Sequence, residues 1–174
     1  MNLTVDIQCA SRAATPDGAD ITRWINAALQ AEAQHKALQG NIEVSVRVVD
    51  TAEMTTLNET YRGKSGSTNV LSFPADLPAV VVDGLLGDIV ICAPVVNQEA
   101  ATQHKAVAAH WAHMAVHGTL HLLGYDHVQE TEAQAMESME TAILGALDFP
   151  CPYGNYDDNH SDTFANTHNG ALHQ

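Results

Sequence analysis

Three histidines stand close together in the stretch 117–127, which reads HGTLHLLGYDH. On a helix, residues four positions apart lie on one face with their Cβ atoms about 5–6 Å apart. His117 and His121 have this spacing, so both rings can point a nitrogen at one common point. Because neutral imidazole is a good ligand for Zn²⁺, the pair predicts a two-histidine metal clamp.

Gly124 offers a way to bring in a third histidine. Glycine often ends helices, because it adopts the left-handed conformation without a Cβ penalty. We therefore expect the helix to stop there and the chain to turn back with His127. Three protein ligands with a fourth position left to water are typical of a catalytic zinc site rather than a structural one. The sequence thus predicts one Zn²⁺ per chain on His117, His121 and His127, although such a set also accepts Ni²⁺.

The roles of Asp126, His113 and His110, which lie near the motif, are less clearly indicated by their spacing. Asp126 precedes the third histidine, so it could orient that ligand or accept a proton in catalysis, and capping the turn after Gly124 is an equally open role. His113 continues the stripe of His117 and His121, but the three span about 12 Å along a helix at 1.5 Å per residue, too far for one ion. We assign His113, and likewise His110, to packing.

A metalloprotease is an alternative interpretation, because the histidine spacing also occurs in metzincin proteases. Those enzymes need a glutamate directly after the first histidine as general base. Gly118 occupies that place here. The protease hypothesis therefore lacks its catalytic base.

Composition indicates one domain that needs no disulfides, since the chain has 174 residues and is 45% hydrophobic. Its three cysteines are widely spaced, so we expect reduced thiols. We see neither a basic and apolar leader nor a run of about 18 apolar residues, which favours a cytoplasmic protein with no membrane partner. The net charge of −14 argues against a nucleic-acid partner, but Arg62 and Lys64 fall together and could form a local basic cleft.

The hydrophobic periodicity alternates between the period of strands and that of helices. We expect an α+β fold, a single domain with a small mixed four-stranded sheet packed with about five helices. The expected strands are at about 3–9, 42–48, 69–73 and 86–92, and the expected helices run from about 21 to a stop at Gly40-Asn41 and then over 51–60, 94–102, 105–123 and 131–147. Residues 75–85 are expected as a connection, with Asp83-Gly84 as a turn. The division is 1–149 for the domain and 150–174 for a flexible C-terminal tail.

The last of these helices has an apolar stripe at four-residue steps, formed by Ala135, Met139, Ile143 and Leu147. A stripe of this kind marks the buried face of a helix. We accordingly expect its glutamates, Glu140 among them, to face mostly water.

Four blocks of the sequence, in this order, resemble the bacterial YbeY endoribonucleases, the rRNA maturation factor family. They are Leu57-Asn58 to Tyr61-Arg62-Gly63-Lys64, Thr68-Asn69-Val70-Leu71-Ser72-Phe73-Pro74, Leu86-Gly87-Asp88-Ile89-Val90-Ile91-Cys92, and His110-Trp111-Ala112-His113 leading into the histidine motif. The resemblance spans about residues 42–147 and is looser over the first 40.

The resemblance implies a single-strand-specific, metal-dependent endoribonuclease that acts in rRNA processing, notably of the 3′ end of small-subunit rRNA, and in ribosome quality control. The implied partners are single-stranded RNA and the ribosome or its small subunit, with no DNA. The family's zinc ligands map onto His117, His121 and His127, and its catalytically important arginine maps onto Arg62.

Arg62 has a chemistry that suits this role, because a guanidinium offers a planar fork of donors to phosphate and to the charge of a transition state. We expect Lys64, Asn69 and Ser72 to join Arg62 in contacting RNA. A different class of function stays open at this point, namely a ribosome-assembly or RNA-binding factor whose zinc is structural.

Overall fold

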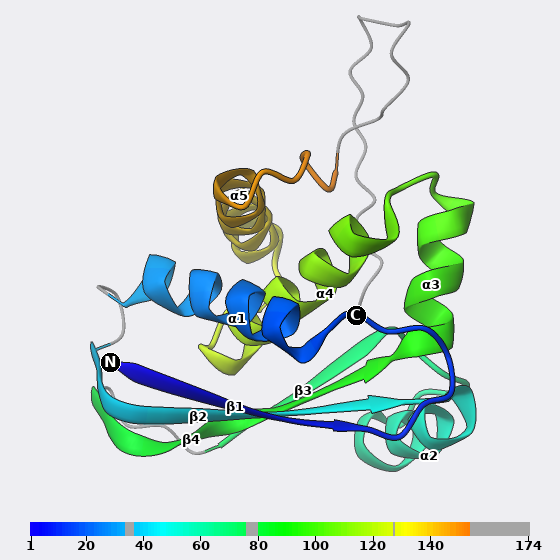
Figure 1. Ribbon diagram of the computed structural model, residues 1–174, viewed down its shortest axis with the longest axis horizontal. Coiled ribbons are helices and arrows are strands. Elements are labelled where there is room, and N and C mark those ends of the chain that lie inside the picture. The colour runs from blue at the N-terminus through cyan, green and yellow to red at the C-terminus, as the bar shows by residue number, and fades with distance from the viewer. Residues whose placement is uncertain (34–36, 76–79, 127, 154–174) are drawn as a thin grey trace, which may run out of the picture.

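The computed structural model describes residues 1–33, 37–75, 80–126 and 128–153. Strands and helices alternate in the first part of the chain, up to β3, and the last three elements are helices; most of the helices form a layer over one face of a single sheet (Figure 1). The strands are β1 (Asn2–Cys9), β2 (Ala37–Val49), β3 (Val70–Pro74) and β4 (Val80–Cys92), and the helices are α1 (Gly18–Glu32), α2 (Thr51–Arg62), α3 (Ala93–Thr102), α4 (Val107–Leu122) and α5 (Glu130–Ala146).

The four strands form one mixed sheet in the order β1-β2-β4-β3. β1 pairs parallel with β2, β2 pairs parallel with β4, and β3 pairs antiparallel with β4. Helices α1, α4 and α5 lie over one face, whereas α2 lies at the opposite face near one end (Figure 1). The predicted α+β fold with a mixed four-stranded sheet and five helices is confirmed for the described residues.

Helix α4 is the central element of the helical layer. Every residue from His110 to Leu120 is buried, because the helix contacts the sheet on one side and α1, α3 and α5 on the others. A helix buried all round normally carries apolar residues. The histidines of α4 therefore need polar partners inside the protein, and these partners define the site.

Gly118 lets α4 approach the sheet closely. A Cβ at this position would lie 3.0 Å from Ile89 Cγ2 and 3.2 Å from Ser72 Oγ. The Ser72 hydroxyl, on β3, donates a hydrogen bond of 2.9 Å to the carbonyl oxygen of Gly118. A side chain at the position that a protease would fill with glutamate would thus crowd the sheet.

Two sequence expectations about boundaries were wrong. Helix α1 ends at Glu32, not at Gly40-Asn41, and β2 already begins at Ala37. Gly40 and Asp83, both with positive φ, lie instead where the pairing of β2 with β4 shifts its register. Asp83 Oδ1 accepts a hydrogen bond of 2.6 Å from the Asn41 amide there.

The segment expected as a connection, 75–85, is partly strand, since β4 starts at Val80. Three consecutive valines, 80–82, favour extended backbone, and they pair with the first residues of β2. The Asp83-Gly84 pair is therefore an irregularity inside a long strand rather than a turn between strands.

No disulfide joins Cys9, Cys92 and Cys151, of which Cys92 is buried and the other two are exposed. Among the described helices, none has the length and apolar character that crossing a membrane requires.

Residues 150–153 follow α5 and contact the helical layer, with Pro152 buried. The expected tail at 154–174 lies outside the described residues, so the division into 1–149 and 150–174 stays a prediction.

The contact at Gly118 leads to a first prediction. We expect Gly118→Ala to lower the free energy of unfolding by up to about 2 kcal/mol, because overpacking costs about 1–3 kcal/mol and the better helix propensity of alanine offsets about 1 kcal/mol. Gly145→Ala is the matched control, since a Cβ on Gly145 of α5 would meet nothing within 4 Å. That variant should be unchanged or more stable in urea unfolding. Equal stabilisation of both variants would contradict the close packing.

Candidate metal centre

A cleft of about 800 Å³ lies where α2, β3 and the end of α4 meet. It brings together most of the residues that the sequence singled out, although they come from distant parts of the chain. Its lining includes Arg62, Lys64, Ser72, His117, His121 and Asp126. The structure therefore places the expected metal face and the expected phosphate contacts in one cavity.

His117 and His121 lie one turn apart on α4 and form one wall of this cleft. Their ring centroids are 4.6 Å apart and the rings are nearly perpendicular. His117 is only 4% exposed, whereas His121 is half-buried. His127 lies outside the described residues, so its role as third ligand stays a prediction.

The turn after α4 follows the expected geometry. The helix ends at Leu122, and Gly124 has a φ of 103°. The amide of Tyr125 returns to the carbonyl of Leu120 at 3.1 Å, which closes the last turn. The chain is thereby directed along the cleft, where Asp126 is exposed.

Tyr125 fixes this turn to α1. Its hydroxyl donates a hydrogen bond of 2.6 Å to Glu32, whose side chain is buried. Burial and the neighbouring Glu32 carboxylate raise the pKa of Tyr125 to about 12. The hydroxyl thus stays protonated and keeps its hydrogen bond at neutral pH.

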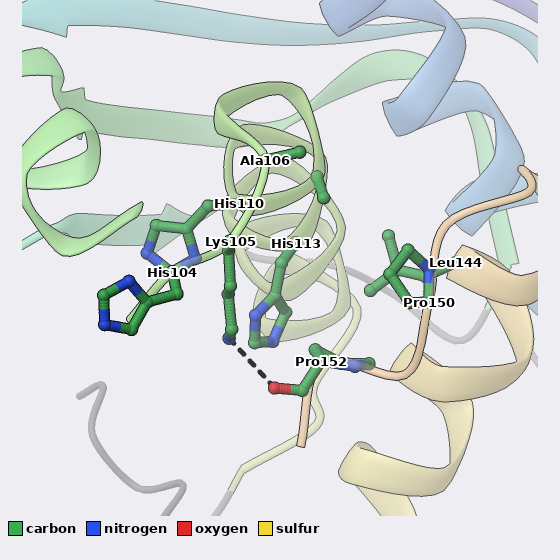
Figure 2. A pocket seen from close by; sticks show the side chains of 9 residues that line it. His104, Lys105, Ala106, His110, His113, Leu144, Pro150 and Pro152 are labelled. Atoms are coloured by element: carbon green, nitrogen blue, oxygen red, sulfur yellow. Dashed lines mark hydrogen bonds between the residues drawn. The ribbon is translucent and has the colours of Figure 1, made fainter. Parts of the chain in front are cut away.

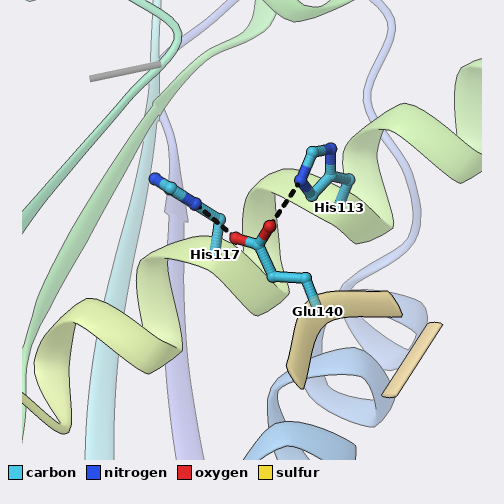
Figure 3. A group of neighbouring side chains, drawn as sticks. All are labelled: His113, His117 and Glu140. Carbon is cyan, nitrogen blue, oxygen red and sulfur yellow. Dashed lines mark hydrogen bonds and ion pairs between the residues drawn. The ribbon is translucent and has the colours of Figure 1, made fainter. Parts of the chain in front are cut away.

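Glu140 of α5 projects between two histidines of α4 (Figure 3). The expectation that it faces water was wrong, because it is fully buried. Its Oε2 lies 2.5 Å from His117 Nδ1, and its Oε1 lies 3.2 Å from His113 Nε2. The Tyr153 hydroxyl also donates to Oε1.

The surroundings keep this carboxyl ionised. Burial by itself raises the pKa of Glu140, but the charges and hydrogen bonds of His113 and His117 outweigh that effect, so its pKa lies well below the ordinary value. Burial lowers the pKa of His113, against the opposing influence of Glu140. Burial and the Glu140 charge also raise the pKa of Tyr153, so its hydroxyl remains a donor.

The donor set fits a divalent metal ion, and two arrangements deserve comparison. In the first, the ion is bound in the cleft by His117 and His121, which both line it. In the second, ligand atoms of His113, His117 and Glu140 lie within 4.8 Å of one another. Ligands of a tetrahedral zinc at about 2.0–2.2 Å stand roughly 3.3–3.6 Å apart, whereas His117 Nδ1 and Glu140 are separated by 2.5 Å. This separation is that of a hydrogen bond, which favours the first arrangement.

Arg62, the last residue of α2, lines the same cleft. Its Nη2 donates a hydrogen bond of 2.6 Å to the carbonyl of Ser72, and its guanidinium carbon lies 5.0 Å from the centre of the Phe73 ring. A guanidinium carries five N–H donors in a fixed fork, of which this bond uses one. The side chain is exposed, so its charge is available to a ligand in the cleft.

Asn58 holds the Gly/Ser loop that follows Arg62. Its side-chain amide donates a hydrogen bond of 2.9 Å to the carbonyl of Gly66. Gly63, with a φ of 68°, ends α2 in the left-handed conformation that glycine favours. The loop therefore presents Lys64, which is exposed, at the edge of the cleft.

Of the two other residues expected to contact RNA, Ser72 and Asn69, only Ser72 lines the cleft. Ser72 lines the cleft, but its hydroxyl is engaged with Gly118. Asn69 is buried outside the cleft lining, and its amide donates to the carboxylate of Glu99. Glu99 also bonds His110 Nε2 at 2.8 Å, as the packing role expected for that histidine requires. The RNA contacts of Asn69 and Ser72 stay predictions.

A second, smaller cavity of about 100 Å³ lies at the other end of α4 (Figure 2). His104, Lys105, His110 and His113 line it together with residues 150 and 152. Lys105 Nζ donates a hydrogen bond of 2.9 Å to the carbonyl of Pro152. This bond ties the segment after α5 to the start of α4, beside Tyr153.

The family model described as Endoribonuclease YbeY matches residues 6–148 of the chain. The chain belongs to the YbeY endoribonuclease family. The resemblance of the four sequence blocks is confirmed by this match, which extends beyond them to β1 and α1.

Several YbeY relatives are about half identical to this chain. An Endoribonuclease YbeY of Methylococcus capsulatus is 52% identical over 87% of this chain and 95% of the relative. That of Pseudomonas putida strain W619 is 51% identical over 92% of this chain and 99% of the relative. A Thermotoga maritima protein of known solution structure has the same fold, with a TM-score of 0.53 and 22% identity over 83% of this chain and 92% of that one.

Sequence reasoning missed Glu140 and Tyr153. A signal for Glu140 was present, because the buried face of α5 contains Met136, Glu140, Ile143 and Leu144. The expected stripe was displaced by one residue, which turned Glu140 outward. No comparable signal marks Tyr153, because it follows α5 in a segment without regular periodicity.

The geometry of α4 leads to a second prediction. We expect purified wild-type protein to carry about one zinc per chain, and His117→Ala and His121→Ala each to lose most of it, since neutral imidazole supplies the metal bonds. Metal content is measured by plasma mass spectrometry. His104→Asn is the control, because His104 is exposed and lies outside the cleft. Full zinc occupancy in His121→Ala would contradict this placement of the site.

Proposed function

We propose that this chain is a metal-dependent endoribonuclease that cleaves single-stranded RNA, with ribosomal RNA as its substrate. Within that class we propose processing of the 3′ end of small-subunit rRNA and a part in ribosome quality control. The observation that carries the proposal is the shared cleft, which Arg62 lines together with His117 and His121. Membership of the YbeY family supports the same activity.

The metal that we propose is zinc, held by His117 and His121 with His127 as the third ligand. When bound, it supplies Lewis acidity that polarises a phosphoryl oxygen and lowers the pKa of water. His117 is fixed by its bond to Glu140, so the ring does not need to reorient when the ion binds. Asp126, exposed at the cleft, is placed to accept a proton or to orient a neighbouring ligand.

Arg62 binds and orients the phosphate in this proposal. Its bond to the Ser72 carbonyl holds the guanidinium at the edge of β3, where the remaining N–H groups can pair with phosphate oxygens in a two-pronged contact. Lys64 adds a second cation at the exposed edge. Two of the seven basic residues of an otherwise acidic chain thus line the cleft.

The shape of the cleft supports single-stranded rather than duplex RNA. His117 is only 4% exposed, so a scissile phosphate has to enter the cavity to approach it. A single strand can splay its backbone and bases into a recessed site, whereas an A-form duplex presents its phosphates on a rigid surface. We infer that the unpaired state of the RNA is required for access.

Two alternatives are weaker. A metalloprotease needs a glutamate at position 118, where a Cβ would already crowd Ile89 and Ser72. An assembly factor with a structural zinc would not need an exposed arginine in the same cleft as the proposed zinc ligands. The ribosome or its small subunit as partner, and a cytoplasmic location, are part of the proposal because rRNA is found there.

The proposed activity makes a third prediction. Wild-type protein should cut single-stranded RNA, leave duplex RNA of the same sequence intact, and lose activity in a chelator until zinc is added back. Casein should not be hydrolysed. Cleavage that persists in chelator, or in His121→Ala, would show that the metal-dependent mechanism is wrong. Metal-loaded protein that binds RNA without cutting it would favour the assembly factor.

Arg62 gives a fourth prediction. We expect Arg62→Ala to lower kcat by about 10²–10³-fold, the usual effect of losing one donor to a developing anion, while zinc content stays unchanged. Arg62→Lys should recover part of the activity, because it keeps the charge but not the fork. Arg23→Ala is the control, since Arg23 is an exposed cation on α1 paired with Asp20. Unchanged cleavage and RNA binding in Arg62→Ala would remove its phosphate role.

A further inference from the structure

Glu140 is an unusual residue to find inside this protein, because a buried carboxylate is costly unless several donors satisfy it. Three donors converge on it from two parts of the chain. His117 and His113 come from α4, and Tyr153 comes from the segment after α5. The two helices and the C-terminal segment are therefore joined through one fully buried group.

The carboxylate determines which ring nitrogens carry protons. An ionised carboxylate only accepts hydrogen bonds, so each histidine must present an N–H toward it. His117 therefore carries its proton on Nδ1, and in the neutral ring the lone pair is then on Nε2. Figure 3 shows this second nitrogen of His117 turned away from Glu140.

We propose that Glu140 is a positioning residue for the metal centre, which holds His117 as the Nδ1-protonated tautomer and thereby presents Nε2 to the ion. Metal-binding histidines commonly donate their other N–H to a carboxylate, which fixes the ring and raises its basicity. Glu140 itself does not bind the metal in this arrangement. The proposal rests on the metal dependence of the proposed function.

His113 and Tyr153 have a supporting part, because both donate to Oε1 and leave Oε2 to His117. They prevent the carboxylate from rotating away from the ring that it orients. The bond from Lys105 to the Pro152 carbonyl holds the neighbouring backbone in turn, as Figure 2 shows. The segment 150–153 thus belongs to the support of the site.

The test measures zinc affinity directly, by competition with a chromophoric chelator at fixed pH. We expect Glu140→Gln to weaken zinc binding about 10–100-fold, the usual effect of losing an outer hydrogen-bond partner. A glutamine offers a single acceptor oxygen, and its NH₂ group donates, so one histidine must give up its N–H contact. Circular dichroism and urea unfolding check that the variant is folded.

Glu99→Gln is the matched control. Glu99 also pairs with a buried histidine of α4, His110, at 2.8 Å, but neither residue lines the cleft. The zinc affinity of the Glu99→Gln variant should stay within about twofold of wild type. A general disturbance of α4 would weaken both variants alike, whereas a positioning role weakens only Glu140→Gln.

A second measurement reads the tautomer in the wild-type protein itself. In the metal-free wild type, ¹⁵N-detected correlation spectra report which nitrogen of each histidine carries the proton, and His117→Gln assigns the signal. We expect Nδ1–H for His117. An Nε2–H tautomer would overturn the proposal, and so would wild-type zinc affinity in folded Glu140→Gln.

Direct ligation by Glu140 is the remaining arrangement, and it has its own signature. If the ion were bound by His113, His117 and Glu140, His113→Gln would abolish zinc binding as completely as His117→Gln, and His121→Ala would not; this result would overturn the proposal. None of these measurements uses RNA. Failure of the proposed function would instead appear as protein that binds zinc as expected but cuts no RNA.

Discussion

The close contact between α4 and β3 determines where the site lies. At Gly118 the helix backbone comes near enough for the Ser72 hydroxyl to reach its carbonyl, and a single added carbon would crowd Ile89. Because β3 is reached through the loop that follows Arg62, this contact also sets the distance between the arginine and the histidine face. A wider spacing between helix and sheet would separate the two halves of the cleft. The absence of a side chain at position 118 thus favours this close packing, and it also leaves no glutamate at the place where a metzincin protease has its general base.

Much of the fold, and the placement of two candidate ligands on one face of a helix, could be predicted because their signals are local. The spacing of His117 and His121 is a property of one helix, and Gly124 ends that helix as its conformational freedom suggests. Alternating hydrophobic residues predicted the first two strands, and a short segment before Pro74 and a nearly continuous apolar run predicted the other two. Arg62 was found through the resemblance of its sequence block to a known family, and its place in the cleft agrees with that assignment.

The rest could not be predicted because it depends on contacts between distant segments. Glu140 lies on the buried face of α5 only because α4 supplies donors for it, and a pattern of apolar residues cannot show that compensation. The early start of β4 at Val80 likewise depends on pairing with the first residues of β2. Gly40 and Asp83 resemble turn signals in sequence, but here they accommodate a shift in register.

The position of Glu140 and Tyr153 late in the sequence has a consequence for the order in which the parts of the site form during synthesis. Both Glu140 and Tyr153 come from the last elements of the described chain, 23 residues or more after His117. During synthesis the chain emerges from its N-terminus, so the residues of α4 are made before those of its partners. The histidine face therefore acquires its hydrogen-bonded form only when α5 and residues 150–153 have docked. Assembly of the metal centre and completion of the fold are then a single step, and a partly synthesised chain lacks an ordered site.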